Sequence, residues 1–555
     1  MNKYLLLLSL IYFILLAFTN CDLDVKFNTT VVEINSQVLF QWNNANPYDV
    51  NAKIVFYKND NEPSLKDHYV ENCFAYLNPI DNFKKNKLKE SGKKLIQAPS
   101  KEGLYKIFFC AESKSSGFYC KIGKPILVIT CPFKDKKIEK NDEVVKNANS
   151  KIEHVIIIIS ENHSFDSIYG NYCKAEPFSN PTCNIGPECC ERIPEELNGF
   201  KPKTLTDIQN SRYDPCHHSY CEDSEINGGK MDRYIIGGEG SNENNFAAAN
   251  DDFWSAKLYF NWAYKYAMSD RFFQSSPGAS SQNDMYFATG KFMFKDNEIA
   301  PQRKSLNGNQ CINYKFKSYF DPTIADILNA CSVPWTIFNE GYSEKKDSNK
   351  CYPKYYDATD NPFAYFPSLT ENKNGNFNFR DYEDFLKDIT NKTLPMVNYV
   401  KFLGVHSEHP GFDNSFITGQ LLSNEVINKV MESEYYRDNT LVILVPDESG
   451  GFYDHVTPPN KSEVDGYTYG PRTQFITVGQ MVKKNYISHV ELEPSSLIRF
   501  IEWNFIGKEG QLETRDKFVN NIGDLIDENI AGKIPSLNPL HGKDRLSNNK
   551  KTKKE

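Results

Sequence analysis

The sequence of 555 residues has no excess of basic charge, no long apolar run after its N-terminus and few histidines. Its 64 lysines and arginines are outnumbered by 72 aspartates and glutamates, so the formal net charge is -8. A chain with this balance has no general attraction for phosphate backbones, which argues against nucleic acid as a partner. After residue 18, no stretch reaches the roughly 18 apolar residues of a membrane-spanning helix, so we expect no later membrane anchor.

Apolar residues, in contrast, are plentiful. Hydrophobic residues make up 40% of the chain and aromatic residues 14%, enough to bury a sizeable core. This content excludes a mainly disordered protein. The length exceeds that of one ordinary hydrophobic core, so two or three domains are expected.

The N-terminus has the features of a secretory signal peptide. Lys3 is followed by an apolar stretch, residues 4–18, that is shorter than a bilayer requires, and then by small or polar residues up to Cys21. We therefore predict a signal peptide over residues 1–21. The protein is expected to be secreted or to lie in the lumen of the secretory or endolysosomal pathway.

The pattern of apolar and polar residues changes along the rest of the chain. Over residues 22–131, short alternating runs such as residues 38–42 are separated by turn-forming residues, which predicts a small all-β sandwich domain. Residues 132–150 are polar and lysine-rich, as in a linker. From 151 to 540, apolar runs alternate with helical patterns, which predicts an α/β domain with a mainly parallel sheet flanked by helices, before a charged tail at 541–555.

Individual elements of the α/β domain can also be predicted. Buried strands are expected at residues 154–159, 335–339, 395–400, 440–445 and 475–478, and helices at 323–330 and 415–435.

The first candidate site residues follow the apolar run at residues 155–159. Ligands of open α/β sheets bind beyond the carboxyl ends of the strands, so Glu161 and Asn162 are expected to project into a site. The structural alternative is a strand-to-helix turn in which Ser160, Asn162 or Ser164 caps the next helix.

The second candidate cluster follows the apolar run at residues 441–445. Asp447 and Glu448 are adjacent carboxylates, which are costly at a strand end unless a cation or hydrogen-bond donors compensate them. A metal is the simplest compensation. Oxygen ligands suit Mg²⁺, Ca²⁺ or Mn²⁺, and nearby histidines would also allow Zn²⁺ or Fe. The alternative is a polar turn, since Gly450 and Gly451 follow.

Serines and histidines provide further candidates. Residues 278–281 read Gly-Ala-Ser-Ser before an expected helix, where the helix N-terminus favours an anion and an ionised nucleophile, so a serine there could attack phosphorus. The alternative is a serine-rich loop. The ten histidines include several beside carboxylate or hydroxyl groups, a mixture that binds metals or phosphoryl groups; these are His218, His409, His455 and His489.

Together, and in this order, the motifs resemble the phosphoesterase family of bacterial-type non-specific phospholipases C and related acid phosphatases, within the alkaline phosphatase superfamily. The matching stretches are Glu-Asn-His-Ser-Phe-Asp at 161–166, Gly-Gly-Lys-Met-Asp at 228–232, residues 278–286, Ser-Glu-His-Pro at 407–410, residues 447–456, Gly-Pro-Arg at 470–472 and residues 495–502. The resemblance spans about residues 152 to 508 and implies an alkaline phosphatase-like fold.

The resemblance also implies roles for individual residues. It implies a divalent metal, with Ca, Mg, Mn, Zn and Fe all open, held by Glu161, Asn162, Asp447 and Glu448. It implies Ser280 as the nucleophile, with Ser281 as its alternative. Further catalytic positions are His218, His409 and His455, and positions that contact the substrate phosphate are Asn283 and His489. The chain departs from the family at Asp284, where an arginine is common, and this bears on the substrate.

The reaction that these roles imply is attack by a serine on phosphorus, followed by hydrolysis of the phosphoserine. We expect phosphodiesters of phospholipids as substrates, with transient contact to a membrane surface. An acid phosphatase acting on phosphomonoesters is the alternative. An alternative of another class is a secreted binding protein with an inactive α/β domain. The sequence indicates no partner protein.

Fourteen cysteines in a secreted chain are expected to form disulfides, because the secretory pathway is oxidising. Six of them crowd residues 173–221, which also hold His217 and His218. We predict that disulfides here staple a loop over the active-site mouth and hold His218 in place, in preference to a zinc site. Sequons that fit glycosylation of a secreted protein occur at Asn28, Asn162, Asn391 and Asn460.

Overall fold

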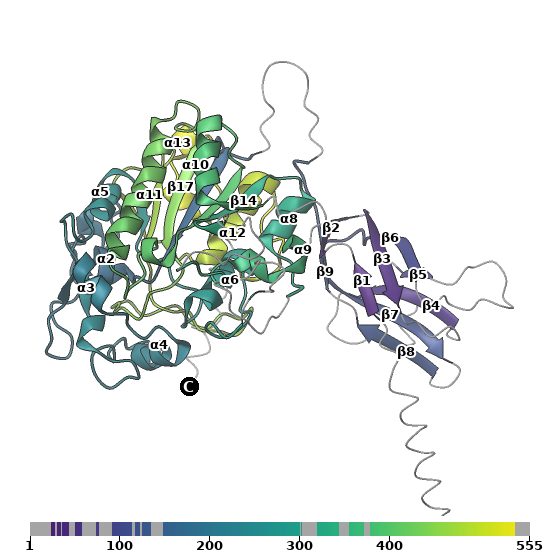
Figure 1. Ribbon diagram of the computed structural model, residues 1–555, viewed down its shortest axis with the longest axis horizontal. Helices are drawn as coiled ribbons and strands as arrows, with labels where there is room; N and C mark the ends of the chain where they lie inside the picture. The colour runs from purple at the N-terminus through teal and green to yellow at the C-terminus, as the bar shows by residue number, and fades with distance from the viewer. Residues whose placement is uncertain are drawn as a thin grey trace, which may run out of the picture. The chain divides into compact units, whose positions relative to one another are not determined.

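The computed structural model describes residues 24–27, 30–34, 36–43, 50–57, 74–76, 92–113, 117–122, 125–134, 148–299, 301, 319–342, 355–370 and 378–538. The predicted signal peptide, residues 135–147 of the predicted linker and the predicted charged tail lie outside these ranges. The chain divides into two compact units, the first formed by residues 1–130 with 320–322 and the second by residues 131–319 with 323–555 (Figure 1).

The described regular elements of the first unit are all strands. They are β1 (Asp24–Phe27), β2 (Val31–Glu33), β3 (Gln37–Asn43), β4 (Val50–Tyr57), β5 (Phe74–Tyr76), β6 (Gly92–Gln97), β7 (Gly103–Ser113), β8 (Gly117–Ile122) and β9 (Ile126–Ile129). One sheet has the order β1-β3-β6, and the other has the order β2-β9-β7-β4-β5 with β8 paired to β7. Because neighbouring side chains on a strand point to opposite faces, Val38 and Phe40 are buried while Leu39 between them is partly exposed. The sandwich arrangement stays a prediction.

The second unit is built on one large sheet. Its strand order is β15-β14-β16-β10-β17-β18-β13-β19. The strands are β10 (His154–Ser160), β13 (Ala267–Ser269), β14 (Trp335–Asn339), β15 (Phe379–Asp381), β16 (Val397–Lys401), β17 (Thr440–Pro446), β18 (Phe475–Val478) and β19 (Tyr486–Ser488). β18 pairs antiparallel with both β17 and β13, and the other pairings of this sheet are parallel. The prediction of an α/β unit with a mainly parallel sheet is confirmed.

Helices and a small strand pair complete the second unit. The helices are α2 (Phe165–Tyr169), α3 (Asp207–Arg212), α4 (Ser219–Ile226), α5 (Lys257–Lys265), α6 (Ser280–Thr289), α8 (Ile324–Ala330), α9 (Pro367–Thr370), α10 (Tyr382–Asn391), α11 (Ser415–Glu432), α12 (Pro494–Ile501) and α13 (Glu528–Ala531). Shorter helical turns are η2 (Pro187–Cys189), η3 (Asn227–Gly229), η4 (Glu243–Asn245), η6 (Pro362–Tyr365), η7 (Gly404–His406), η8 (Glu502–Ile506), η9 (Arg515–Lys517) and η10 (Ile522–Leu525). The pair β11 (Lys203–Leu205) and β12 (Ala247–Ala249) is parallel.

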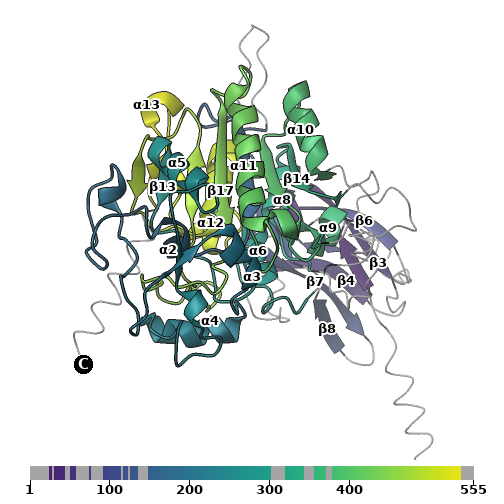
Figure 2. The ribbon, with the colours of Figure 1, turned by 60° about the vertical axis from the view of Figure 1, so that its left-hand side comes forward.

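The core lies between this sheet and its helices. Figures 1 and 2 show α11 lying along β17, and α11 also packs against α5. Ile156 and Ile158 of β10 share one apolar cluster with residues of α2, α5, α10 and α11. A second group of helices, α6, α8 and α12, packs together through α6. The central strands are buried on both faces, which explains their continuous apolar sequences.

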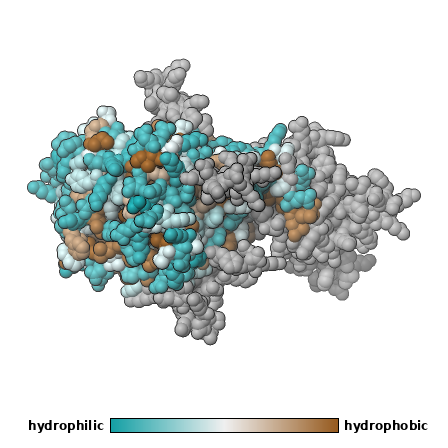
Figure 3. All heavy atoms as spheres, turned by 90° about the horizontal axis from the view of Figure 1, so that it is seen from above, coloured by the Kyte–Doolittle hydropathy of each residue, from teal (hydrophilic) through white to brown (hydrophobic). Residues whose placement is uncertain are grey.

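The surface of the second unit is largely polar. On the face shown in Figure 3, apolar residues are scattered among hydrophilic ones. Among the exposed apolar residues are the neighbours Phe253 and Trp254, whose rings lie 5.1 Å apart. Within the described residues, no helix combines the length and apolar character that crossing a bilayer requires.

Candidate active site

The candidate site lies at the edge of the large sheet where three parallel strands end. In the strand register, Ile159 of β10 lies opposite Lys401 of β16, and Ser160 lies opposite Pro446 of β17. Glu161, Lys401 and Asp447 therefore leave adjacent strands at the same edge, the place where ligands of such sheets bind. All three side chains are buried.

The first acidic motif contains both a helix cap and an unusual asparagine. Ser164 caps α2 by accepting a hydrogen bond from Ser167 N, so the predicted capping role belongs to Ser164. Asn162 has a φ of 65° and is fully buried. A Cβ atom on Gly450 would lie 2.2 Å from Asn162 O, so the second acidic motif packs closely against this backbone only because a glycine is there.

The second acidic motif buries two carboxylates side by side. Asp447 Oδ1 accepts a hydrogen bond of 2.9 Å from Glu448 N, and Glu448 Oε2 accepts one from Gly450 N. Asp447 Oδ2 and Glu448 Oε1 have no hydrogen-bond partner among the described residues. Burial, with Glu222 and Asp447 nearby, raises the pKa of Glu448 well above its ordinary value, and His217 opposes this rise. Two oxygen atoms of this motif therefore lack a partner unless a proton or a cation is bound there.

Lys401 brings a positive charge next to these carboxyl groups. Its Nζ lies 3.3 Å from Glu161 Oε1, 3.4 Å from Asp284 Oδ2 and 3.8 Å from Asp447 Oδ2. Burial alone would lower the pKa of Lys401, but the surrounding carboxylates of Asp284, Glu161, Asp447 and Asp360 raise it well above its ordinary value. The sequence analysis missed Lys401, whose only signal is a charged residue at the end of a buried apolar strand.

The residues at this edge fit a divalent metal ion. At this edge, the buried polar atoms that lack a hydrogen-bond partner within the described part of the chain include Asn162 Oδ1 and Nδ2, Asp447 Oδ2, Glu448 Oε1 and Asp284 Oδ1. Oxygen atoms of carboxylates and amides are the ligands that hard cations prefer, and such atoms are costly to bury unpaired. The predicted ligand set of Glu161, Asn162, Asp447 and Glu448 is thus compatible with a metal.

Two histidines lie beside these carboxylates. Ligand atoms of Asp214, His217 and His409 all lie within 4.8 Å of one another. His409 Nε2 is 3.9 Å from Glu161 Oε2. Burial opposes protonation of His217, but Glu448 and Asp214 raise its pKa to about 10. The predicted residue His218 is exposed, and its ring centroid lies 5.8 Å from that of Tyr220. It is His217 that interacts electrostatically with Glu448.

The predicted nucleophile opens helix α6. Ser280 is the first residue of α6, and Asp284 follows it by one helical turn on the same face. Asp284 contacts Lys401, and helical spacing places Ser280 on the Asp284 face of α6. Ser281 lies about 100° further around the helix and its backbone N–H donates to Asn297 Oδ1 at 3.0 Å.

Glu222 holds the loop before α6 in place. Its Oε2 accepts hydrogen bonds of 2.8 Å from Gly278 N and from Gln274 Nε2, and its Oε1 accepts one of 2.8 Å from Ser449 Oγ. Burial raises the pKa of Glu222 to about 7. Glu222 therefore connects the serine loop to the second acidic motif. It was not singled out from the sequence, where it stands in a polar helix.

Asn283 also binds this loop and not an open site. Its Oδ1 accepts from Ser276 N at 3.2 Å, and its Nδ2 donates to Gly278 O at 2.8 Å. Both amide atoms are thus engaged with the backbone. The predicted contact of Asn283 with substrate phosphate is not visible in this arrangement and stays a prediction.

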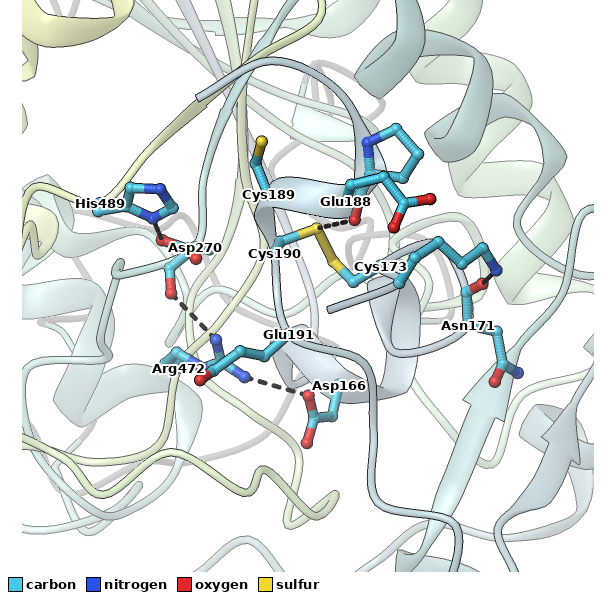
Figure 4. Close-up of a disulfide and its surroundings, with 12 residues drawn as sticks. Asp166, Asn171, Cys173, Glu188, Cys189, Cys190, Glu191, Asp270, Arg472 and His489 are labelled. Atoms are coloured by element: carbon cyan, nitrogen blue, oxygen red, sulfur yellow. Dashed lines mark hydrogen bonds and ion pairs between the residues drawn. A yellow bond between two sulfur atoms is a disulfide. The ribbon is translucent and has the colours of Figure 1, made fainter. Parts of the chain in front are cut away.

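His455 and His489 belong to a second buried network, part of which Figure 4 shows. His455 Nδ1 lies 2.7 Å from Asp166 Oδ2 and Nε2 lies 3.3 Å from Glu191 Oε2, so both ring nitrogens contact carboxylates. His489 Nδ1 lies 2.9 Å from Asp270 Oδ1, and its Nε2 lies 2.7 Å from Cys183 O. The structure does not offer a free ring nitrogen of either histidine to a metal or a phosphate.

Arg472 neutralises the carboxylates of this network. Its Nη2 lies 3.1 Å from Asp166 Oδ1 and its Nε lies 2.9 Å from Asp454 Oδ1, and all three side chains are fully buried. Ligand atoms of Asp166, Asp454 and His455 lie close enough together for a metal. Since a guanidinium already bridges the two carboxylates, this group is better explained as a structural ion-pair network.

All six cysteines of the crowded stretch are paired, as predicted. The bridges are Cys173–Cys190, Cys183–Cys189 and Cys216–Cys221, and a fourth joins Cys131 to Cys331. The Cys173–Cys190 bridge precedes Glu191, the partner of His455 (Figure 4). The Cys216–Cys221 bridge encloses His217 and His218 in a short loop.

The predicted sequons differ in accessibility. Asn391 and Asn460 are exposed, whereas Asn162 is fully buried and cannot accept a glycan in the folded chain. Asn28 lies outside the described residues.

The chain is similar to known phosphoesterases over much of its second unit. The Phosphoesterase family model matches residues 152–506. The non-hemolytic phospholipase C of Burkholderia pseudomallei is 21% identical over 401 residues, which cover 64% of this chain and 55% of that protein. A probable acid phosphatase of Kluyveromyces lactis is 26% identical over 132 residues, 23% of this chain and 31% of that protein. The chain spans about half the length of the curated phospholipases it matches.

Among solved structures, a phosphonate monoester hydrolase from Silicibacter pomeroyi matches with 10% sequence identity and a TM-score of 0.26. The match covers 50% of this chain and 72% of that chain.

Proposed function

Because the chain belongs to the phosphoesterase family, as its ordered motifs predicted, we propose that it is a secreted, metal-dependent phosphoric ester hydrolase of the phospholipase C type. The proposal is carried by the buried side-chain oxygens of Asn162, Asp447 and Glu448, which lack hydrogen-bond partners in the described part of the chain. They lie where the parallel strands of the sheet end. Such atoms are stable in a folded protein when a cation engages them.

The four predicted ligands would hold the metal, and they come from the two acidic motifs: Glu161, Asn162, Asp447 and Glu448. When bound there, a divalent ion supplies positive charge that polarises a phosphoryl oxygen and favours an ionised hydroxyl.

Ser280 is the proposed nucleophile. Ser280 lies at the start of α6, and the positive end of the helix dipole there stabilises the attacking alkoxide. As Ser280 Oγ bonds to phosphorus, the ester oxygen of the leaving alcohol departs with its electron pair. Water then cleaves the phosphoserine and releases the phosphoryl group.

His409 is the proposed donor of the proton that the leaving alcohol needs. Its Nδ1 lies 2.6 Å from Pro410 O and so carries a hydrogen, while its Nε2 faces Glu161. His217 is proposed to remain protonated beside it, because its pKa is raised to about 10, and to attract phosphate oxygens. These assignments rest on their contacts with the predicted metal ligands.

The phospholipase type is preferred to the acid phosphatase type for two reasons. The phospholipase C relative matches 64% of the chain, whereas the acid phosphatase relative matches 23%. The exposed pair of Phe253 and Trp254 is suited to contact lipid headgroups, because aromatic residues are favourable at membrane interfaces. The predicted secretory signal and the four disulfides support secretion.

The deciding experiment compares hydrolysis of phosphatidylcholine vesicles with hydrolysis of p-nitrophenyl phosphate by the purified protein with added Ca²⁺, Mg²⁺, Mn²⁺, Zn²⁺ or Fe²⁺. We expect lipid hydrolysis that S280A abolishes and S281A retains. Rapid turnover of the monoester with intact lipid would favour the acid phosphatase alternative. No hydrolysis with any metal would favour the binding-protein alternative.

A further inference from the structure

Lys401 has three ammonium hydrogens and three carboxylate neighbours. Its Nζ contacts Glu161, Asp284 and Asp447 at 3.3, 3.4 and 3.8 Å. A fourth carboxylate, Asp360, interacts with it electrostatically. The lysine side chain is only 3% exposed. Its donors are therefore occupied by the protein, so Lys401 is unsuited to binding a substrate oxygen directly.

The carboxylates around Lys401 come from both halves of the candidate site. Glu161 and Asp447 are predicted metal ligands at the ends of β10 and β17. Asp284 lies on α6, one turn after Ser280. Lys401 thus links the metal-binding edge of the sheet to the helix that carries the nucleophile.

The cluster buries more carboxyl groups than the Lys401 ammonium contacts. Glu161, Asp284, Asp360, Asp447 and Glu448 are five buried carboxylates. Asp284 Oδ1 and Asp447 Oδ2, on two of the carboxylates that contact Lys401, have no hydrogen-bond partner within the described ranges. Without Lys401, these two carboxylates would be available to a second metal ion.

We propose that Lys401 is a positioning residue that takes the place of a second metal ion, so that the site is a centre of one metal and one lysine. This inference rests on the proposed function. Lys401 keeps Glu161 and Asp447 directed at one metal and holds Asp284, and with it Ser280, beside that metal.

The test counts metal ions. Wild-type protein, K401M and the matched control K483M are loaded with Mn²⁺, freed of excess metal by gel filtration and analysed by mass spectrometry and electron paramagnetic resonance. Lys483 also forms an ion pair, 3.2 Å from Asp524, but lies outside the site. We expect one uncoupled Mn²⁺ per chain in wild type and K483M. We expect two spin-coupled Mn²⁺ per chain in K401M.

A double variant, K401M/D284N, removes one charge of each sign and guards against misfolding of K401M. We expect it to return to one Mn²⁺, because the second position loses a ligand. The Mn²⁺ count of wild type tests the inference even if neither variant folds. A spin-coupled Mn²⁺ pair in wild type would overturn it. One Mn²⁺ or none in folded K401M would also overturn it.

The assay of phosphatidylcholine and p-nitrophenyl phosphate hydrolysis, run on the same samples, separates the two proposals. If wild type binds one Mn²⁺ and hydrolyses a phosphoester but K401M is unchanged, only the role of Lys401 is wrong. If wild type neither binds Mn²⁺ nor hydrolyses a phosphoester, both proposals are wrong.

Discussion

His455 Nδ1 lies 2.7 Å from Asp166 Oδ2, deep in the second unit. This contact joins the two acidic motifs of the sequence, because Asp166 belongs to the stretch at 161–166 and His455 to the stretch at 447–456. Glu191 contacts the other ring nitrogen of His455, and Arg472 contacts the other carboxylate oxygen of Asp166. The geometry thus gives His455 the features of a residue that holds the motifs together.

The first prediction concerns the pH dependence of stability. Burial opposes protonation of His455, but Asp166 and Glu191 raise its pKa to about 9, above its ordinary value of 6.5. Protonated His455 should therefore stabilise the fold fully below about pH 6.5, and this contribution should disappear as the pH rises through about 9. We expect wild type to exceed H455Q in unfolding free energy by about 3 kcal/mol more at pH 6 than at pH 9.5.

Urea denaturation at the two pH values measures this difference. The control is H154Q, since burial lowers the pKa of His154 and so gives it the opposite pH dependence. A stability gap between wild type and H455Q that does not change with pH would contradict the ion pair.

The second prediction concerns Glu222, the acceptor that anchors the loop before Ser280. E222Q has a single side-chain acceptor oxygen, so it cannot accept all three bonds from Gly278, Gln274 and Ser449. We expect kcat to fall about 10- to 100-fold with little change in KM, because the loop shifts the serine without removing a substrate contact.

Glu225, on the same helix, provides the control. Burial raises its pKa to about 10, so at neutral pH it is already protonated and resembles glutamine in charge. Steady-state kinetics of E225Q should match those of wild type within about twofold. Equal losses in E222Q and E225Q would show that the helix is merely sensitive to any change.

Some residues of the candidate site could be predicted from the sequence, and others could not. Glu161 and Asp447 were predictable because each follows a fully apolar run, and parallel strands place such ends together. Lys401 was not, because its place depends on β16 pairing next to β10, and strand order cannot be read from hydrophobic periodicity. Likewise, His217 and His218 are adjacent in sequence but point to different surroundings, which only the fold decides.

Backbone geometry explains why His455 lies away from the predicted metal ligands. His455 is close in the sequence to the predicted ligands Asp447 and Glu448, so it was expected in the same site. Gly450 and Gly451 have φ values of 67° and 70°, and this left-handed turn leads the chain from Glu448 to the separate network of Asp166 and Arg472.

The third prediction separates two disulfides by function. The Cys131–Cys331 bridge closes a sequence separation of 200 residues, whereas Cys216–Cys221 closes 5. By loop-closure entropy, C131S/C331S should cost about 5 kcal/mol of stability and C216S/C221S about 2 kcal/mol. Only the second variant should lose phosphoester hydrolysis, because its loop carries His217. Thermal denaturation and the hydrolysis assay together test this, and an inactive C131S/C331S that remains folded would contradict it.

The last prediction concerns metal removal. Chelation should leave Glu161, Asp447 and Glu448 as neighbouring buried carboxylates with Lys401 and His217 as the nearest cations, so their repulsion should destabilise the sheet edge. We expect EDTA to abolish hydrolysis and to lower the melting temperature, and added metal to restore both. D447N removes one of the repelling charges and one ligand, so its melting temperature should respond far less to EDTA. In D524N, whose carboxylate binds Lys483 and Ser488 elsewhere, the response should equal that of wild type. Equal EDTA shifts in wild type and D447N would place the metal outside the two acidic motifs, and the proposed ligand set would then be wrong.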